Sequence, residues 1–65
     1  MELTVNGEDR QVPEGTTVSG LLAALGLPED GIAVAVAGEV HPRSRWCEVL
    51  PAYADVDVLT AVQGG

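Results

Sequence analysis

The sequence predicts an α+β fold, in which a mixed sheet of four to five strands carries one main helix packed on one face. Two observations predict it. Several short segments alternate apolar and polar residues, the period of a half-buried strand, and only one segment has the spacing of a helix. The order along the chain is strand, strand, helix, then three strands. In so short a chain, a single helix can cover one face of one sheet.

The first two strands form a hairpin. Residues 2–5 alternate polar and apolar side chains, and Asn6-Gly7 follows them. Both residues of this pair tolerate a positive φ, which makes the pair a strong hairpin signal. We expect the returning strand at residues 10–13, with Val12 pointing inward and Pro13 ending the strand or placing it at an edge.

The helix comes next. Thr16 or Thr17 can cap its start, Gly26 suits the left-handed position after its end, and Pro28 blocks continuation. Gly20 lies inside and costs the helix about 1 kcal/mol relative to alanine. We expect a close approach between helix and sheet to explain it. Four apolar residues fall at i, i+3, i+4 and i+7 and share one helix face: Val18, Leu21, Leu22 and Leu25.

The second half of the chain contains three more predicted strands. Residues 32–38 form one, Gly38-Glu39 turns the chain into a short strand around Val40, and residues 57–63 form the last. Residues 42–47 are irregular or form one tight helical turn. We expect Trp46 to anchor the loop after Val40 against the margin of the sheet, with a partner hot spot as the alternative, and Arg43 to remain near the surface. We expect the core to comprise one face of the last strand together with the following residues: Leu3, Val5, Val18, Leu21, Leu22, Leu25, Val34 and Val36.

The last strand is apolar on both faces, although one helix can cover only one of them. The uncovered face would leave an exposed apolar patch, which favours a docking surface. The alternative is a central strand partly shielded by loops. Val58, Thr60 and Val62 lie on one face, and Leu59 and Ala61 on the other. The candidate docking surface comprises Val58, Leu59, Thr60, Ala61, Val62 and Gln63.

Composition excludes several classes of function. Ten acidic residues against three arginines give a formal charge of −7, which repels phosphate backbones, so we expect no nucleic-acid partner. No apolar run is long enough to cross a bilayer, so we expect no membrane partner. With a single cysteine no internal disulfide can form, which fits the cytoplasm. An acidic surface suits a partner with a basic face, although acidity also serves solubility alone.

The residues that could carry catalysis are few. His41 has no metal-ligand partner at suitable spacing, which favours a solvated loop residue. Cys47 follows Trp46 and has no nearby histidine, which favours a packing role over a reactive thiol. Asp55 and Asp57 share a strand face, and solvation explains them better than a metal site. We therefore expect no catalytic residues, no metal and no cofactor.

The chain ends in Gly64-Gly65, directly after an apolar strand and Gln63. A terminal carboxylate is ionised at neutral pH and could attack the α-phosphate of ATP. Glycines lack a Cβ, so the two could thread a narrow channel to a buried active site. A frayed end is the alternative interpretation. We expect Gly65 to be the modified residue and Gly64 to allow threading.

Segments along nearly the whole chain together match the pattern of one family: Val5-Asn6-Gly7; Thr17, Val18, Leu21 and Leu22; Ala33 to Val36; Gly38-Glu39-Val40; Pro42-Arg43-x-x-Trp46; and Val58 to Gly65. Through them the sequence resembles the ThiS family of sulfur-carrier proteins of thiamine biosynthesis, which have the ubiquitin-like β-grasp fold. The chain departs from the family pattern at Ala37-Gly38, where members usually have Asn-Gly or Asn-Gln. It departs again at Tyr53-Ala54, where they usually have Gly-Asp, which indicates a remodelled turn at residues 51–55.

The resemblance implies one β-grasp sulfur-carrier domain, residues 1–65, with a flexible tail at residues 64–65, monomeric when free. A ThiF-like adenylating enzyme would join AMP to Gly65. A cysteine desulfurase or other sulfur donor would convert the adenylate to a thiocarboxylate, and a ThiG-like thiazole synthase would take the sulfur. The chain would not itself be an enzyme. Alternatives are a molybdopterin-synthase-type carrier, a carrier for cysteine synthesis or tRNA thiolation, and a β-grasp interaction module with an inert tail.

Overall fold

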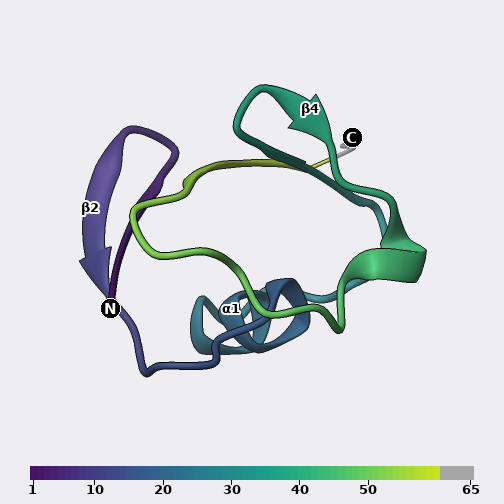
Figure 1. Ribbon diagram of the computed structural model, residues 1–65. Helices are drawn as coiled ribbons and strands as arrows, with labels where there is room; N and C mark the ends of the chain where they lie inside the picture. The colour runs from purple at the N-terminus through teal and green to yellow at the C-terminus, as the bar shows by residue number, and fades with distance from the viewer. Residues whose placement is uncertain (61–65) are drawn as a thin grey trace.

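The computed structural model describes residues 1–60 of the chain. Five strands form one mixed sheet in the order β2-β1-β5-β3-β4, and helix α1 lies on one side of it (Figure 1). This confirms the predicted fold class. The elements are β1 (Glu2–Val5), β2 (Glu8–Gln11), α1 (Val18–Ala24), β3 (Ile32–Val36), β4 (Glu39–Val40), the 3-10 turn η1 (Arg43–Arg45) and β5 (Asp55–Thr60).

The sheet consists of two antiparallel hairpins joined through its last strand. β1 pairs with β2, and β3 pairs with β4. β5 lies between the hairpins, parallel to β1 and antiparallel to β3, with Val56 opposite both Val5 and Val36. The strand that leads toward the C-terminus is therefore the central strand, as one of the two interpretations of its sequence supposed.

Both hairpins turn through two residues of positive φ. Asn6 and Gly7 have φ of 51° and 82°, and Ala37 and Gly38 have φ of 55° and 80°. Such turns match the twist of the strands they join. Pairing resumes immediately after Gly7, so β2 begins at Glu8, two residues earlier than predicted, and ends at Gln11. Val12 is half-buried against the core, as expected.

The helix begins and ends as its sequence indicates, but Gly20 has a different explanation from the one expected. The Thr17 hydroxyl oxygen accepts a hydrogen bond from the Gly20 N–H at 3.1 Å, and Gly26 has a φ of 74°. Gly20 is exposed, and the nearest atom to a Cβ added there would be that same hydroxyl oxygen at 3.4 Å. The proposed close approach to the sheet is wrong.

The core lies between the sheet and α1. Of the predicted members, Leu25 and Val36 are only partly buried, and the others are buried. The helix has only seven residues, so the loop between η1 and β5 completes the cover. Hydrogen bonds from the Ser19 N–H to the Trp46 carbonyl and from the Leu50 N–H to the Thr16 carbonyl tie this loop to the helix. The buried residues that had not been predicted individually are Leu50, Ala54, Val56 and Val58.

No helix within residues 1–60 has the length and apolar character that a membrane crossing requires.

Candidate functional site

The site suggested by the sequence is the end of β5 and the residues that follow it. Val58 faces the core and is buried, whereas the Leu59 side chain is 63 % exposed on the opposite face. Thr60 is exposed and still paired with Ile32. The other residues predicted for this site, Ala61, Val62, Gln63, Gly64 and Gly65, lie outside the described residues.

The first hairpin turn holds β5 close to its end. The Asn6 N–H donates to the Val56 carbonyl at 2.9 Å. The Asn6 side-chain amide then continues the ladder: its Nδ2 donates to the Val58 carbonyl at 3.3 Å, and its Oδ1 accepts from the Val58 N–H at 2.8 Å. The Asn6 side chain thus makes the hydrogen bonds to β5 that a strand backbone would make, at a point where β1 has already ended. The sequence predicts Asn6 only as a turn residue.

The sheet face opposite α1 is called the open face here. Because side chains alternate along a strand, the residues between the buried positions lie on this face. The register aligns Thr4 with Asp9 and Asp55, Ala35 with Asp57 and Val40, and Ala33 with Leu59. The open face therefore comprises Glu2, Thr4, Asp9, Gln11, Ala33, Ala35, Val40, Asp55, Asp57 and Leu59.

Charge and apolar area are separated on the open face. Asp9 and Asp55 flank Thr4 at the end where β5 begins, and Leu59 lies beside Ala33 at the end that leads to the tail. Arg10 is opposite buried Leu3, so its strand position faces the helix side. The chain's other two arginines belong to η1. The open face is thus acidic at one end and apolar at the other.

The Pro-Arg-x-x-Trp element is structural. Trp46 is 3 % exposed, and its Nε1 donates to the His41 carbonyl at 2.9 Å. The Arg43 guanidinium lies 5.5 Å from the indole ring centroid and donates to Asp30 Oδ1 at 3.2 Å. Arg43 thereby links η1 to the loop after α1 while remaining near the surface. The predictions for both Trp46 and Arg43 are confirmed.

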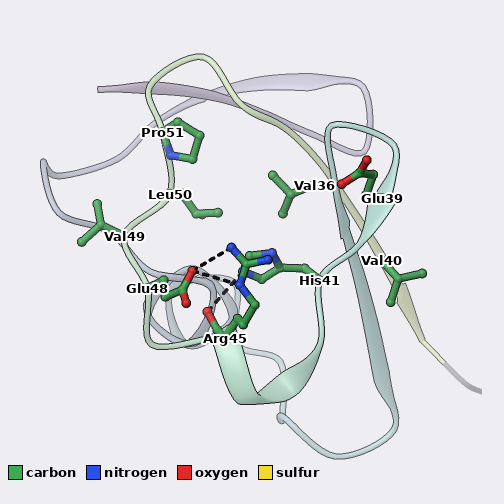
Figure 2. Close-up of a pocket in the computed structure, with 9 residues that line it drawn as sticks. All are labelled: Val36, Glu39, Val40, His41, Arg45, Glu48, Val49, Leu50 and Pro51. Carbon is green, nitrogen blue, oxygen red and sulfur yellow. Dashed lines mark hydrogen bonds and ion pairs between the residues drawn. The ribbon is translucent and has the colours of Figure 1, made fainter.

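A pocket of about 240 Å³ lies between β4 and the loop after η1 (Figure 2). Arg45 and Glu48, which both line the pocket, form an ion pair in which Nη2 and Oε1 are 3.0 Å apart. The hydrogen bond from Arg45 lowers the pKa of the Glu48 carboxyl and raises the pKa of the guanidinium. The pocket borders the Val36 end of β3, whereas Thr60 is paired at the opposite end. Nine residues line it: Val36, Glu39, Val40, His41, Arg45, Glu48, Val49, Leu50 and Pro51.

The described residues assemble no catalytic group. His41 is half-buried, with Nε2 3.2 Å from the Arg45 carbonyl oxygen, and is thus less solvated than expected. Cys47 is exposed, so the packing role expected for it is wrong; Trp46 takes the inward position at this turn. Among residues 1–60, no cluster of three His, Cys, Asp or Glu side chains could hold a metal ion.

Comparison with known proteins supports the interpretation of the fold. The model of the ThiS family matches residues 2–65. A crystal structure of the thiamine biosynthesis protein ThiS from Geobacter metallireducens is similar, with a TM-score of 0.80, 32 % identity and 100 % of each chain covered. An NMR solution structure of a thiamine biosynthesis protein from the same organism has a TM-score of 0.80 and 32 % identity, covering 100 % of this chain and 88 % of the other. Comparison with curated protein sequences gave no match.

The strand order, the single helix and these similarities define the class of the protein as a ubiquitin-like β-grasp domain. Within that class, the chain belongs to the ThiS family. Members of this family are small sulfur carriers and are not catalysts themselves, and they act with partner enzymes for adenylation and sulfur transfer.

Proposed function

We propose that this protein carries sulfur for thiamine thiazole synthesis as a thiocarboxylate on Gly65. One observation carries the proposal: the family match extends from residue 2 to residue 65 and so includes Gly64-Gly65. The likeness to thiamine biosynthesis proteins at 32 % identity favours the thiamine pathway. The partners would be a ThiF-like adenylating enzyme, a cysteine desulfurase or other sulfur donor, and a ThiG-like thiazole synthase, all in the cytoplasm.

The chemistry requires only a carboxylate from this chain. A carboxylate oxygen of Gly65 attacks the α-phosphorus of ATP, an O–P bond forms, and pyrophosphate leaves. The product is a mixed anhydride of the carboxylic acid and AMP. A hydrosulfide-equivalent sulfur from the donor then attacks the carbonyl carbon, forms a C–S bond, releases AMP and loses its proton. No electron transfer is needed when the sulfur arrives at the oxidation state of sulfide. A persulfide on a cysteine desulfurase would instead displace AMP to form an acyl disulfide, and a thiol would then reduce its S–S bond, leaving the thiocarboxylate on Gly65 and a new disulfide on the donor side.

The body of the protein supports this use of its tail. β5 is the central strand, and Asn6 and Ile32 hold its last residues on either side. The tail therefore leaves a part of the fold whose direction is fixed. A partner that binds the body can then present the Gly65 carboxylate to a buried site without having to order the preceding strand.

The docking surface that we propose around β5 has Leu59 on the open face and Thr60, which is exposed, on the side of Val58. Of its described members, Val58 faces the core, so Leu59 and Thr60 are available to a partner. Leu59 and its neighbour Ala33 supply apolar area, while Asp57 supplies negative charge. An enzyme that holds the phosphates of ATP needs positive charge near its channel, and this charge would attract an acidic carrier and speed the encounter.

Changes at the tail test the proposal. Deleting Gly65 leaves the carboxylate one residue short of the α-phosphate, and adding one residue after Gly65 displaces the reacting group. Gly64→Ala adds a Cβ where a narrow channel must admit the chain. We expect all three variants to lose ATP–pyrophosphate exchange with the adenylating enzyme, while thermal unfolding stays unchanged. Exchange at the wild-type rate after deletion of Gly65 would refute the carrier chemistry.

Mass spectrometry separates the alternatives. Co-expression with the adenylating enzyme and a sulfur donor should replace one oxygen of Gly65 with sulfur, and the intact mass should rise by the difference between the two atoms. The variant without Gly65 is the matched control and should keep its mass. An unchanged wild-type mass would favour an inert interaction module. Consumption of the thiocarboxylate by thiazole synthase then distinguishes the thiamine pathway from molybdopterin synthesis.

A further inference from the structure

Tyr53 adopts a backbone conformation that a tyrosine rarely takes. Its φ is 64°, and the other non-glycine residues of positive φ among residues 1–60 are Asn6 and Ala37. Asparagine tolerates this region and alanine is small, but a bulky residue there is an outlier. The Ala54 N–H donates to the Pro51 carbonyl at 3.3 Å, so Tyr53 occupies the third position of a turn, where a positive φ favours glycine.

Backbone hydrogen bonds hold this turn against the first strand. The Tyr53 N–H donates to the Glu2 carbonyl at 2.6 Å, and the Thr4 N–H donates to the Ala54 carbonyl at 2.9 Å. These bonds do not depend on the identity of the side chain at residue 53. The surrounding structure therefore imposes the strained φ, and glycine would adopt it at lower cost.

The Tyr53 side chain contributes little to the fold in return. It is 78 % exposed, and its hydroxyl makes no hydrogen bond to any residue of the described chain. An aromatic ring in solvent loses the burial energy that usually accounts for such a residue. The backbone conformation of Tyr53 thus lowers the stability of the fold, and the exposed ring contributes little burial energy to offset this loss.

The surroundings of Tyr53 indicate the chemistry of a partner. The Tyr53 N–H is bonded to the Glu2 carbonyl, Asp55 follows two residues later at the start of β5, and the register sets Asp55 and Asp9 on either side of Thr4. The three arginines lie elsewhere: Arg10 at a strand position facing the helix side, the others in η1. A guanidinium from another protein could stack on the ring while these carboxylates neutralise it.

We propose that Tyr53 binds an arginine or lysine of the adenylating enzyme and so orients the carrier on it. This inference rests on the proposed function. Tyr53 lies just before β5 and the tail follows its far end, roughly 20 Å away at about 3.3 Å per residue. Contacts at both ends of one strand, Tyr53 at its start and Leu59 near its end, would fix the direction in which the tail enters the enzyme.

Substitution of Tyr53 by glycine separates the effect of its backbone strain on stability from the effect of its ring on binding. Tyr53→Gly should raise the Tm by a few degrees, because it relieves the strained φ. It should also weaken binding to the adenylating enzyme by about tenfold, as expected for an aromatic anchor. Ala37→Gly is the matched control, since it relieves a similar φ without removing a ring. It should raise the Tm and leave the affinity unchanged. Tyr53→Phe should keep the affinity, because it keeps the ring.

The affinities are measured by titration calorimetry with the purified adenylating enzyme. If Tyr53→Gly binds as tightly as the wild type, or Tyr53→Phe binds as weakly as Tyr53→Gly, the proposal for the ring is wrong and the carrier function stands. If wild-type protein fails to bind and supports no ATP–pyrophosphate exchange, the proposed function itself falls. Should Tyr53→Gly fold poorly, Tyr53→Asn, which also tolerates positive φ, supplies the same comparison.

Discussion

Asn6 combines two roles, one in the first hairpin turn and one in holding β5. Its φ of 51° belongs to the turn, while its side-chain amide bonds both backbone groups of Val58 on β5. The same residue therefore closes the first hairpin and secures the central strand near its exit. The Asn-Gly pair predicted the first role. The second became visible only when the parallel pairing of β1 and β5 was known.

We expect Asn6→Ala to lower the free energy of unfolding by about 1–3 kcal/mol, because it removes two hydrogen bonds to β5 and places alanine at a positive φ. Asn6→Asp is the matched comparison. It keeps the oxygen that accepts from the Val58 N–H and tolerates the φ, but it sets a second carboxylate oxygen against the Val58 carbonyl oxygen in place of the donor, so it too should be less stable than the wild type. Urea unfolding measures both changes. Equal stability of wild type and Asn6→Ala would show that the side-chain bonds contribute nothing.

At the scale of the element, helix α1 contains a glycine that the fold does not require. Gly20 has no positive φ, and an added Cβ would meet only the Thr17 hydroxyl oxygen at ordinary contact distance. Gly26, just after the helix, differs because its φ is 74°. Alanine substitution is therefore expected to change the free energy of unfolding in opposite directions at these two glycines.

Gly20→Ala should raise the free energy of unfolding by about 0.5–1 kcal/mol, since alanine loses less backbone entropy on entering a helix. Gly26→Ala should lower it by about 1 kcal/mol or more, because alanine is strained in the left-handed region. Thermal and urea unfolding of the two variants provide the measurement. A loss of stability in Gly20→Ala would show that the helix and its cap are packed more tightly than the described geometry allows.

The strands and helix could be predicted because their residues repeat with a fixed period, but the loop after η1 has no period. Trp46 was predicted to be buried from its size alone. Leu50 and Ala54 were not predicted individually, and Cys47 was assigned to the wrong side, because nothing in a nonrepetitive loop fixes which side chains point inward. The remodelled turn near Tyr53 was predicted, but its positive φ was not, since tyrosine gives no signal for it.

For the whole molecule, the two faces of the sheet differ in burial and in charge. The face under α1 contains the fully buried side chains, whereas the open face carries Leu59 and the aspartates. A sheet covered on one side only leaves its second face free for a partner. The sequence predicts an uncovered apolar face on the last strand. The acidic end of the open face follows from the register of β1, β2 and β5, which sets Asp9 and Asp55 on either side of Thr4.

Substitutions on the two faces should therefore affect different quantities, stability for the core face and affinity for the open face. Leu22→Ala, in the core, should cost about 2–5 kcal/mol of stability and, well below its Tm, leave affinity for the adenylating enzyme unchanged. Leu59→Ala should change stability by less than about 1 kcal/mol and weaken that affinity. Unfolding and calorimetry on both variants test the division. A large loss of stability in Leu59→Ala, with affinity intact, would place this residue in the fold and not in the docking surface.

The central position of β5 also determines how the domain responds to mechanical force. A partner that draws in the tail pulls β5 along its own axis, while β1 and β3 hold it on both sides. Hydrogen bonds between strands run roughly across that axis, so the load falls on many of them together in shear. An edge strand pulled sideways would instead lose its bonds one at a time. We expect residues 1–60 to resist traction applied along β5 without unfolding.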